Sequence, residues 1–449
     1  MQSFEIDKND ILKVKNAILA GDEALLKVLE DYHASEIAIL FERLSISEQQ
    51  HIINLLPSDL ASEVISEMDE ESHPEDLLFQ LHPDKRTEIV EELDYDDATD
   101  IISYLDDHEQ NEILKDLSHE DASNIRALLN YNEKTAGGLM NTDLICVNVN
   151  STKKDAIDEI IRQSEKMEEF YTIYVVDDVD RFMGIVSLKD IIKAKHDAKM
   201  IDLVKVDAVY VSPETDQEEV AYLISQYNLT SIPVIDRNHK LLGRVTFDDV
   251  IDVMEEESTE DILKISGVSE DEELSGNWVD AVKSRLPWLI INLATAFLAS
   301  SVVRYFDPTI KLIPSLAAYM TIIAGMGGNA ATQALAVTVR RISLYDLTDK
   351  QAYNTVLKEL TVGFINGAVN GLIVFAFAFF FDGNPMLGLV IFCAMTGNLV
   401  IAGVTGAGIP LILKRVGIDP AIASSIIITT FTDVFGFLLI LGLASKLLL

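Results

Sequence analysis

The chain has 449 residues, enough for two or three domains, and it combines a formal net charge of −38 with 49% hydrophobic residues. From Ala281 onward it holds 7 acidic and 11 basic residues, so this part carries +4 and the first 280 residues carry −42. So large an acidic excess argues against binding nucleic acid or an anionic membrane surface through the first part. It favours bound cations, although a solvated acidic surface has the same composition.

The two cysteines, Cys146 and Cys393, lie far apart in the sequence and exclude a disulfide framework or a cysteine metal motif. Because the stretch from Met1 to Lys15 is polar, we expect no cleaved signal peptide and a cytosolic first part.

Residues 1–132 are predicted to form a superhelix of short helices. A hydrophobic anchor recurs every 12 or 13 residues, with turn and capping residues between anchors. The anchors are Leu44, Leu56, Met68, Leu81, Leu93, Leu105, Leu117 and Leu129. One such helix cannot bury its apolar face alone, so the pattern predicts stacking. Acids gather where helices start, and for Asp96, Asp97 or Asp100 taken singly helix capping is the simplest explanation.

Residues 133–254 contain an internal repeat. The sequence Tyr-Val-Val-Asp at 174–177, followed by Gly-Ile-Val-Ser-Leu-Lys-Asp at 184–190, recurs 59 residues later as Pro-Val-Ile-Asp and Gly-Arg-Val-Thr-Phe-Asp-Asp. Each copy is predicted to run strand, helix, strand, turn, strand, helix, with hairpins at 177–181 and 236–240. The shared Gly-x-x-Ser/Thr-x-x-Asp signature resembles a tandem pair of CBS domains, at 133–199 and 200–254.

CBS pairs often bind adenine nucleotides, and others are purely structural. The resemblance implies that a hydroxyl would bind phosphate and a carboxylate would bind ribose. The residues it marks as a candidate ATP site are Ser187, Asp190, Pro233 and Thr246.

Residues 255–285 are predicted to form a charged connecting helix that Gly267 and Gly276 would interrupt. It leads into a membrane domain, residues 286–449, with five apolar segments of spanning length at about 288–306, 313–339, 361–381, 386–413 and 422–443. With the N-terminus in the cytosol, the inner flanks carry eight basic residues and the outer flanks three. This asymmetry predicts a multi-pass protein of the cell (inner) membrane with its C-terminus outside.

Glycines mark two of these segments. Gly325, Gly327 and Gly328 precede Asn329, and three glycines in four residues favour a kink or local unwinding of the second segment. Carbonyl groups freed in this way are tolerated in a membrane only inside protein or beside water. In the third segment, Gly363, Gly367 and Gly371 repeat every fourth residue, and a close-packing face explains them.

One acid, Asp433, lies in the middle of the last segment. A carboxylate there costs at least a few kcal/mol, so it usually faces a bundle interior or a water-filled path. It is predicted to share a polar helix face with Ser425, Thr429, Thr432 and Gly436, which we interpret as the lining of a cation path. A structural Asp that bonds a neighbouring helix is the alternative.

The combination resembles the MgtE family of magnesium channels and transporters over nearly the whole chain. The motifs that carry the resemblance are Gly-Met-Gly-Gly-Asn at 325–329, Gly-Ile-Asp-Pro-Ala at 417–421, Thr-Asp-Val-Phe-Gly at 432–436, and Thr-Phe-Asp-Asp-Val at 246–250 with Glu260 and Asp261. The fold class expected is multidomain α and α/β plus an α-helical membrane domain: a helical solenoid, tandem CBS domains, a connecting helix and five transmembrane helices.

The resemblance implies a homodimer in the lipid bilayer, in which Asp433 selects hydrated Mg²⁺ beside the carbonyl of Thr429. The candidate pore residues are Asp433, Thr429, Ser425, Gly327, Gly328 and Asn329. It also implies regulatory Mg²⁺ bound by acids of the first part, the connector and the pore mouth. These are Asp216, Glu218, Asp249, Asp252, Glu257, Glu260, Asp261, Asp419, Asp96, Asp100 and Glu63. Asn228 stands where the family can have an acid.

The function expected is Mg²⁺ import down its electrochemical gradient, with closure when Mg²⁺ binds the acidic part. The alternative is a nucleotide-regulated transporter of another divalent cation, such as Co²⁺ or Mn²⁺. We find no catalytic carboxylates paired with a His, no nucleophile elbow and no Gly-rich phosphate loop, so we do not expect an enzyme.

Overall fold

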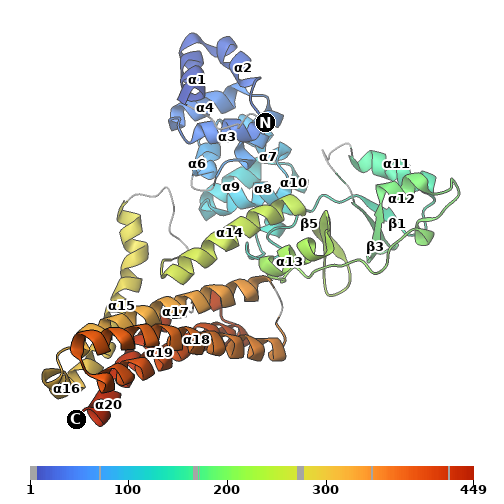
Figure 1. Cartoon of the computed structure of the whole chain (residues 1–449). Coiled ribbons are helices and arrows are strands. Elements are labelled where there is room, and N and C mark those ends of the chain that lie inside the picture. The colour runs from blue at the N-terminus through green and yellow to red at the C-terminus, as the bar shows by residue number, and fades with distance from the viewer. Residues whose placement is uncertain are drawn as a thin grey trace. The chain divides into compact units, whose positions relative to one another are not determined.

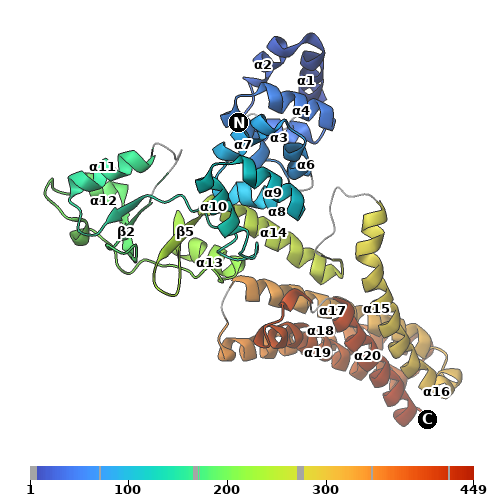
Figure 2. The same ribbon diagram turned by 180° about the vertical axis from the view of Figure 1, so that it is seen from behind.

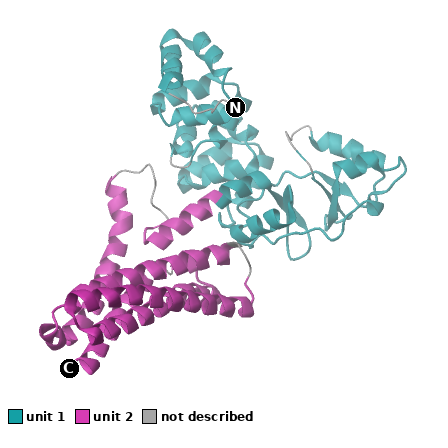
Figure 3. Ribbon diagram, in the orientation of Figure 1, with its two compact units in different colours: residues 1–254 teal, residues 255–449 magenta. Residues whose placement is uncertain are grey.

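The computed structural model describes residues 8–69, 72–164, 170, 172–269, 278–344, 347–422 and 425–449. They form two compact units, Met1–Met254 and Glu255–Leu449 (Figure 3). The predicted fold class is confirmed, since unit 1 joins a helical superhelix to a repeated α/β part and unit 2 is a bundle of long helices.

Unit 1 begins with short helices (Figures 1 and 2). They are α1 (Lys8–Ala20), α2 (Asp22–Leu29), α3 (Ala34–Phe41), α4 (Ile46–Leu55), α5 (Ser58–Ser66), α6 (Pro74–Phe79), α7 (Pro83–Glu92), α8 (Tyr95–Ser103), α9 (Asp107–Asp116) and α10 (His119–Leu128). Helices two apart in the chain pack together: α5 against α3 and α7, α7 against α9, and α8 against α6 and α10. The predicted superhelix is therefore confirmed.

The apolar anchors lie in the turns between helices. Leu56, Leu93 and Leu117 each stand one residue before the N-cap of the next helix and are at most 8% exposed. An apolar residue at this position fixes how the chain enters the helix. Each of α1 to α10 also has an acid in its first turn, where the helix dipole favours negative charge.

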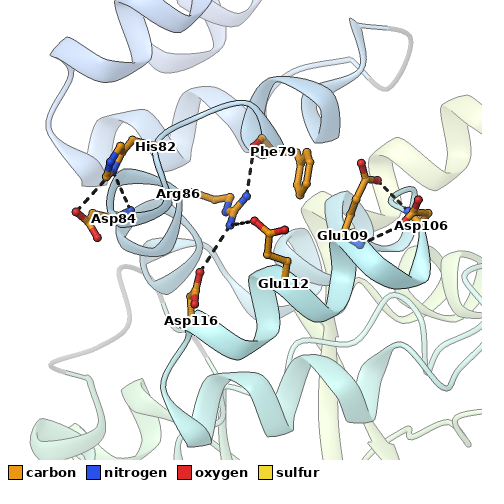
Figure 4. A network of polar contacts seen from close by, with 8 residues as sticks. All are labelled: Phe79, His82, Asp84, Arg86, Asp106, Glu109, Glu112 and Asp116. Carbon is orange, nitrogen blue, oxygen red and sulfur yellow. Dashed lines mark hydrogen bonds and ion pairs between the residues drawn. The ribbon is translucent and has the colours of Figure 1, made fainter.

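A buried arginine joins three of these helices (Figure 4). Arg86 on α7 is 2% exposed, and its Nη1 donates to the Phe79 carbonyl at the end of α6 at 3.3 Å. Its Nη2 lies 3.2 Å from Glu112 and 3.7 Å from Asp116, both on α9. The guanidinium also lies 5.2 Å from the centroid of the Phe79 ring. A basic residue thus supplies a counter-charge inside an acidic superhelix.

The α/β part contains the predicted repeat. Its first copy has β1 (Cys146–Asn148), α11 (Lys153–Ser164), β2 (Thr172–Val176), β3 (Phe182–Ser187) and α12 (Leu188–Lys193), and a 3₁₀ turn, η2 (Met200–Asp202), follows. The second copy has α13 (Gln217–Tyr227), β4 (Ser231–Ile235), β5 (Leu241–Thr246) and α14 (Phe247–Ser266). Both hairpins are antiparallel and have a register shift one pair from the turn. Where the first copy has β1, the second has a single parallel bridge from Val211 to Val234.

The connector predicted over 255–285 is interrupted after Ser266. α14 starts in the second repeat, crosses the division at residue 254 and ends at Ser266, and the next helix begins at Trp278. Gly267 ends α14 as predicted, because its φ of 76° lies in the left-handed region that glycine adopts without steric cost. Gly276 lies outside the described residues.

Unit 2 contains α15 (Trp278–Tyr305), α16 (Asp307–Leu312), α17 (Leu316–Leu344), α18 (Asp349–Asp382), α19 (Pro385–Arg415), η3 (Pro420–Ile422) and α20 (Ser425–Leu447). Of the described helices, α15, α17, α18, α19 and α20 are long and apolar enough to cross a membrane. This confirms the predicted five spans. α19 is central, because it packs against α17, α18 and α20.

Gly327 of α17 and the glycines of α18 serve close packing, whereas a Cβ at Gly325 would meet nothing within 4 Å. The sequence predicted a kink or local unwinding of α17 at 325–329, and the unwinding is wrong, because the helix is continuous through these residues. Gly327 is buried against α19. Because the helix is continuous, no carbonyl is freed at this point and none has to be solvated. On α18, a Cβ at Gly363 would lie 2.3 Å from the Leu399 carbonyl oxygen, and one at Gly367 2.7 Å from Cα of Thr396. The predicted packing face of α18 is confirmed.

Candidate functional site

Asp433 lies near the middle of α20, with three threonines among the four residues before it and an apolar stretch after it. Its side chain is half-buried, and within the described part of the chain no hydrogen bond or ion pair reaches its carboxylate. The alternative of a structural Asp bonded to a neighbouring helix needs such a partner, so this geometry does not favour it. An ionisable group at membrane depth without a protein partner is suited to a solvated ion or a water-filled path.

The predicted polar face of α20 divides into two. Gly436 is buried against α19 and Thr432 is buried against Gly327 of α17, whereas Thr429 and Asp433 are half-buried. Thr432 Oγ1 donates to the Thr429 carbonyl at 2.9 Å. Ser425 is the first residue of α20, and its side chain lies outside the described part of the structure. The face available to an ion therefore carries Asp433 and Thr429.

On α17, the three candidate pore residues differ in their surroundings. A Cβ at Gly328 would lie 3.3 Å from Thr429 Cγ2, so Gly328 contacts the half-buried face of α20. Asn329 is exposed in the single chain, and Gly327 is buried and faces α19. Gly328 and Asn329 thus remain candidates to line a path with Asp433, and Gly327 is placed behind them.

Sequence reasoning missed Asn398, a fully buried residue of α19. Its Nδ2 donates to the Ile323 carbonyl of α17 at 3.0 Å. Its Oδ1 has no hydrogen-bond partner among the described residues. An unsatisfied buried acceptor costs about 1–3 kcal/mol, whereas an interhelical hydrogen bond in a membrane contributes about 0.6 kcal/mol. In the sequence, Asn398 could have been noticed as the single Asn of an apolar helix. Its contacts with Gly327 and Gly436, which are distant in the sequence, become visible only in the structure.

A second missed residue is Glu359 on α18, which is 7% exposed. It lines a cavity of about 240 Å³ between α17, α18 and α19, together with the polar side chains of Gln333 and Asn366. Lys358 Nζ lies 3.5 Å from its carboxylate. Glu359 thus has a counter-charge beside it just before the apolar segment begins.

The C-terminal half of α14 contacts the end of the helix bundle within unit 2. Lys264 Nζ forms ion pairs with Glu260 and, at 2.8 Å, with Asp419. Ser343 Oγ donates to Asp261 at 3.2 Å, and burial raises the pKa of the Asp261 carboxyl. Ile265 packs on the apolar cluster that includes Leu335 and Ile428. Three predicted regulatory acids, Glu260, Asp261 and Asp419, are therefore close together, and a lysine already bridges two of them.

A second group of acids lies within unit 1, where the superhelix meets the second repeat. Asp96 is 8% exposed and accepts a hydrogen bond from Asn141 Nδ2 at 3.1 Å. Burial and the Asp249 carboxylate raise the pKa of Asp96 well above its usual value. Burial, Asp94 and Asp249 raise the pKa of Asp97 to about 7. Burial also raises the pKa of Asp249, although Thr246 donates to it through its hydroxyl and, at 3.0 Å, its amide. Helix capping alone does not explain acids that face one another.

The donor chemistry of both groups suits a hard divalent cation. Carboxylate oxygens are its preferred ligands, and mutual repulsion is the cost that a cation removes. Within the described residues, no three His, Cys, Asp or Glu side chains are placed to hold one metal ion directly. Mg²⁺ commonly keeps several of its waters, so contacts through water fit this spacing.

The remaining predicted regulatory acids are more dispersed. Asp216 is the N-cap of α13 and accepts from the Glu218 amide at 2.9 Å. Asn228 ends the same helix with a φ of 51°, a backbone conformation in which Asn is enriched. The others lie on helix surfaces or are half-buried: Asp252 and Glu257 on α14, Asp100 on α8 and Glu63 on α5. Asp252 contributes to the raised pKa of Asp249, and Glu257 to that of Asp261.

Of the four candidate nucleotide residues, Ser187 and Thr246 occupy equivalent places in the two repeats. Ser187 caps α12 by accepting from the Asp190 amide at 3.2 Å, and Asp190 pairs with Lys205 at 3.2 Å. Thr246 holds the corresponding position before α14 and donates to Asp249. Pro233 lies in β4 opposite Arg244. In both copies the hydroxyl and carboxylate of the signature therefore meet at a helix start.

The bundle of membrane-length helices, with an acid that has no polar partner among the described residues, the α/β repeat and the acidic superhelix are together the features of a cation transporter. Residues 32–134 match the MgtE intracellular N domain, residues 136–197 and 201–256 match CBS domains, and residues 320–443 match the divalent cation transporter MgtE. The chain is 33% identical to the magnesium transporter MgtE of Thermus thermophilus, over 97% of this chain and 98% of that protein. It is 34% identical to MgtE of Enterococcus faecalis, over 94% and 96% of the two chains. The chain therefore belongs to the MgtE family of magnesium transporters, and its five apolar helices mark an integral membrane protein.

Solved structures agree with this assignment for the first part of the chain. The cytosolic domain of the Mg²⁺ channel MgtE, in complex with ATP, aligns with a TM-score of 0.52 and 33% identity, over 54% of this chain and 99% of that domain. The soluble part of a magnesium transporter aligns with a TM-score of 0.50 and 28% identity, over 56% and 97%.

Proposed function

We propose that the protein imports Mg²⁺ through a path lined by Asp433. The observation that carries this proposal is the half-buried Asp433 carboxylate, which has no polar partner among the described residues of a magnesium-transporter chain. With an inside-negative potential, moving two charges inward gains about 4.6 kcal/mol per 100 mV. Flux down the electrochemical gradient therefore needs no other energy source.

The path is completed by a second copy of the chain. One Asp433 from each protomer of a homodimer gives a centre of charge −2 for an ion of charge +2. Because Mg²⁺ dehydrates reluctantly, the carboxylates act through its water shell, and cavity size and charge together select it. Thr429, Gly328 and Asn329 would line the same path, with Ser425 at the start of α20 and Gly327 behind it.

Cytosolic Mg²⁺ closes the path. The acids of unit 1 repel one another when no cation is bound, and a shared ion favours the compact state. The regulatory set has two centres, Asp96 with Asp249 in unit 1, and Glu260 and Asp261 with Asp419 in unit 2. α14 carries acids of both, so it is the element through which ion binding acts on the helix bundle. Glu63, Asp100, Asp216, Glu218, Asp252 and Glu257 extend the two centres.

The proposed function gives each domain a role. Residues 1–132 sense Mg²⁺ with the CBS domains at 133–199 and 200–254, residues 255–285 connect, and residues 286–449 form the pore. The N-terminus is cytoplasmic and the C-terminus lies outside the cell membrane, as the basic flanks predict. ATP would occupy the CBS pair at Ser187, Asp190, Pro233 and Thr246. The ATP-bound cytosolic domain of a relative supports this assignment.

A second candidate is a transporter of Co²⁺ or Mn²⁺ that nucleotide controls. The divalent-cation description of the matched family leaves room for it. Uptake of Mg²⁺, Mn²⁺ and Co²⁺ into proteoliposomes, at low and at millimolar Mg²⁺ on the cytosolic face, separates the two. We expect Mg²⁺ uptake that millimolar Mg²⁺ suppresses. Faster Co²⁺ or Mn²⁺ uptake that responds to ATP and not to Mg²⁺ would favour the second candidate.

A further inference from the structure

Three membrane helices meet at one buried amide. Asn398 is fully buried in α19, and its Nδ2 bonds the Ile323 carbonyl of α17 at 3.0 Å. This carbonyl also belongs to the helical ladder of α17, because the helix is continuous there. The amide thus ties α19 to α17 one turn before Gly327.

Two glycines make room for this amide. A Cβ at Gly327 of α17 would lie 2.2 Å from Asn398 Nδ2, and a Cβ at Gly436 of α20 would lie 2.9 Å from the same atom. The Cβ position at Gly327 is also 3.2 Å from Cβ of Thr432. Any larger side chain at either glycine must displace Asn398, so the contact fixes α17 and α20 against α19 at a single level.

Asp433 is adjacent to this contact in the sequence. Gly436 faces the amide, and Thr432, one turn earlier in α20, lies against Gly327. Consecutive residues of a helix are about 100° apart around its axis. With Thr432 held against Gly327 and Gly436 held against Asn398, Asp433 must point to a different side of α20, the half-buried face that it shares with Thr429. A rotation of α20 about its axis would move Asp433 away from this face and Thr432 out of the contact together.

We propose that Asn398 is a positioning residue for ion selection, which acts by fixing the rotation of α20 so that the Asp433 carboxylate faces the ion path. Its Oδ1 has no partner among the described residues. The amide therefore does not maximise stability at this point, which fits a role in orientation. The proposal rests on the proposed function of Asp433 and adds a residue that touches neither the ion nor the path.

The test is a size exchange in the intact protein. The variants are Asn398→Ala, Gly327→Ala and the double variant, with Gly442→Ala on α20 as a matched control because its added Cβ meets nothing within 4 Å. Asn370→Ala is the control for the amide, because among the described residues Asn370 Nδ2 bonds the Asn366 carbonyl of its own helix α18 and no other helix. Each is assayed for thermal unfolding in detergent and for uptake of Mg²⁺ and Ca²⁺ into proteoliposomes.

We expect Gly327→Ala to lower Mg²⁺ uptake at least tenfold and to lower the unfolding temperature. Asn398→Ala in the same chain should restore the unfolding temperature, because it removes the clash. Asn398→Ala alone should keep the unfolding temperature within a few degrees of wild type and lower the ratio of Mg²⁺ to Ca²⁺ uptake several-fold. Both controls should resemble wild type.

Three results would overturn the proposal. The first is a wild-type ratio of Mg²⁺ to Ca²⁺ uptake in Asn398→Ala with wild-type uptake. The second is the same unchanged ratio in Asn398→Ala accompanied by parallel losses of uptake and unfolding temperature. The third is a Gly327→Ala variant that behaves like Gly442→Ala. Asp433→Asn, assayed alongside, separates this inference from the proposed function. If Asp433→Asn retains uptake and the wild-type ion ratio, the pore assignment fails. If Asp433→Asn loses uptake while Asn398→Ala behaves like wild type, only the role of Asn398 is rejected.

Discussion

The two units use carboxylates in opposite ways. In unit 2, Asp433 is a single acid in an apolar helix and has no polar partner among the described residues. Its isolation in apolar surroundings is what marks it as a functional residue. Unit 1 instead has a crowded group of acids, Asp96, Asp97 and Asp249. Their mutual repulsion, which helps to raise the pKa values of Asp96 and Asp97, marks them as functional residues. An isolated acid can select an ion by charge and geometry, whereas a crowd can report how much cation is present. The comparison teaches that ion choice and ion sensing need different densities of charge.

The largest effect should come from the isolated acid. Asp433→Asn keeps the size of the side chain and removes its charge, so we expect Mg²⁺ uptake into proteoliposomes to fall more than tenfold. Asp382→Asn is the control, because Asp382 accepts a hydrogen bond from Tyr319 at 2.5 Å, which an amide oxygen can still accept. If Asp433→Asn transports at half the wild-type rate or more, the single acid does not select the ion.

The next effect concerns the lysine that already neutralises a pair of acids. Lys264→Met leaves Glu260 and Asp419 without the cation that bridges them. Because Mg²⁺ must then replace the lysine, we expect several-fold faster uptake at low cytosolic Mg²⁺ and retained closure at millimolar Mg²⁺. The dependence of uptake on cytosolic Mg²⁺ measures this.

Lys283→Met provides the control for Lys264, since Lys283 pairs with Asp280 in an exposed ion pair of the kind that contributes little. An unchanged Mg²⁺ dependence in Lys264→Met would show that α14 stays docked without its lysine.

A smaller effect should follow pH at the crowded acids. A carboxyl whose pKa is raised in the folded state favours folding when protonated, so its stability contribution is lost as pH rises from about 4 through about 7, the pKa of Asp97. Without Mg²⁺, hydrogen exchange in residues 95–103 and 246–253 of the intact protein should therefore be slower at pH 5.5 than at pH 8, after correction for the intrinsic rate.

Asp97→Asn should flatten this pH dependence, and millimolar Mg²⁺ should restore protection at pH 8. Asp107→Asn, at an exposed acid of α9, should leave the dependence unchanged. Equal protection at both pH values in the wild-type protein would contradict repulsion among these carboxylates.

The smallest effect on transport should come from Arg86. Arg86→Met removes a buried cation from between Phe79, Glu112 and Asp116, and such losses cost about 1–3 kcal/mol. We expect faster hydrogen exchange in α6, α7 and α9 with an unchanged maximal rate of Mg²⁺ uptake. Arg126→Met, at an exposed residue of α10, is the control. A change in the ratio of Mg²⁺ to Ca²⁺ uptake would mean that the superhelix contributes to ion choice.

Periodic features of the fold could be predicted from the sequence because each depends on residues close in the chain. The 12-residue spacing of anchors predicted the superhelix, and the 59-residue repeat predicted two hairpins that have the same register. The five apolar segments predicted the five spans. Gly267 predicted the end of α14, because a left-handed residue terminates a helix whatever surrounds it.

Features that depend on a distant neighbour could not be predicted. The glycines at 325–328 indicated unwinding because nothing in the local sequence shows that Asn398, some 70 residues later, fills the space beside Gly327. The polar face of α20 looked uniform, yet Thr432 is buried beside Gly327 of α17 and Asp433 is half-buried. Likewise, the raised pKa of Asp96 depends on Asp249, which belongs to another domain of unit 1.

The acids at the helix starts of α1 to α10 have a consequence for the physics of the whole superhelix. Apolar anchors set its repeat length, and each repeat adds negative charge at a similar place. The superhelix therefore behaves as a folded rod with regularly spaced negative charges, which is a polyelectrolyte. Its stiffness should vary with ionic strength, because the Debye length is about 8 Å in physiological salt and about 30 Å at 0.01 M. In dilute buffer the rod should be straight and stiff, and in the cell it should be compliant enough to bend.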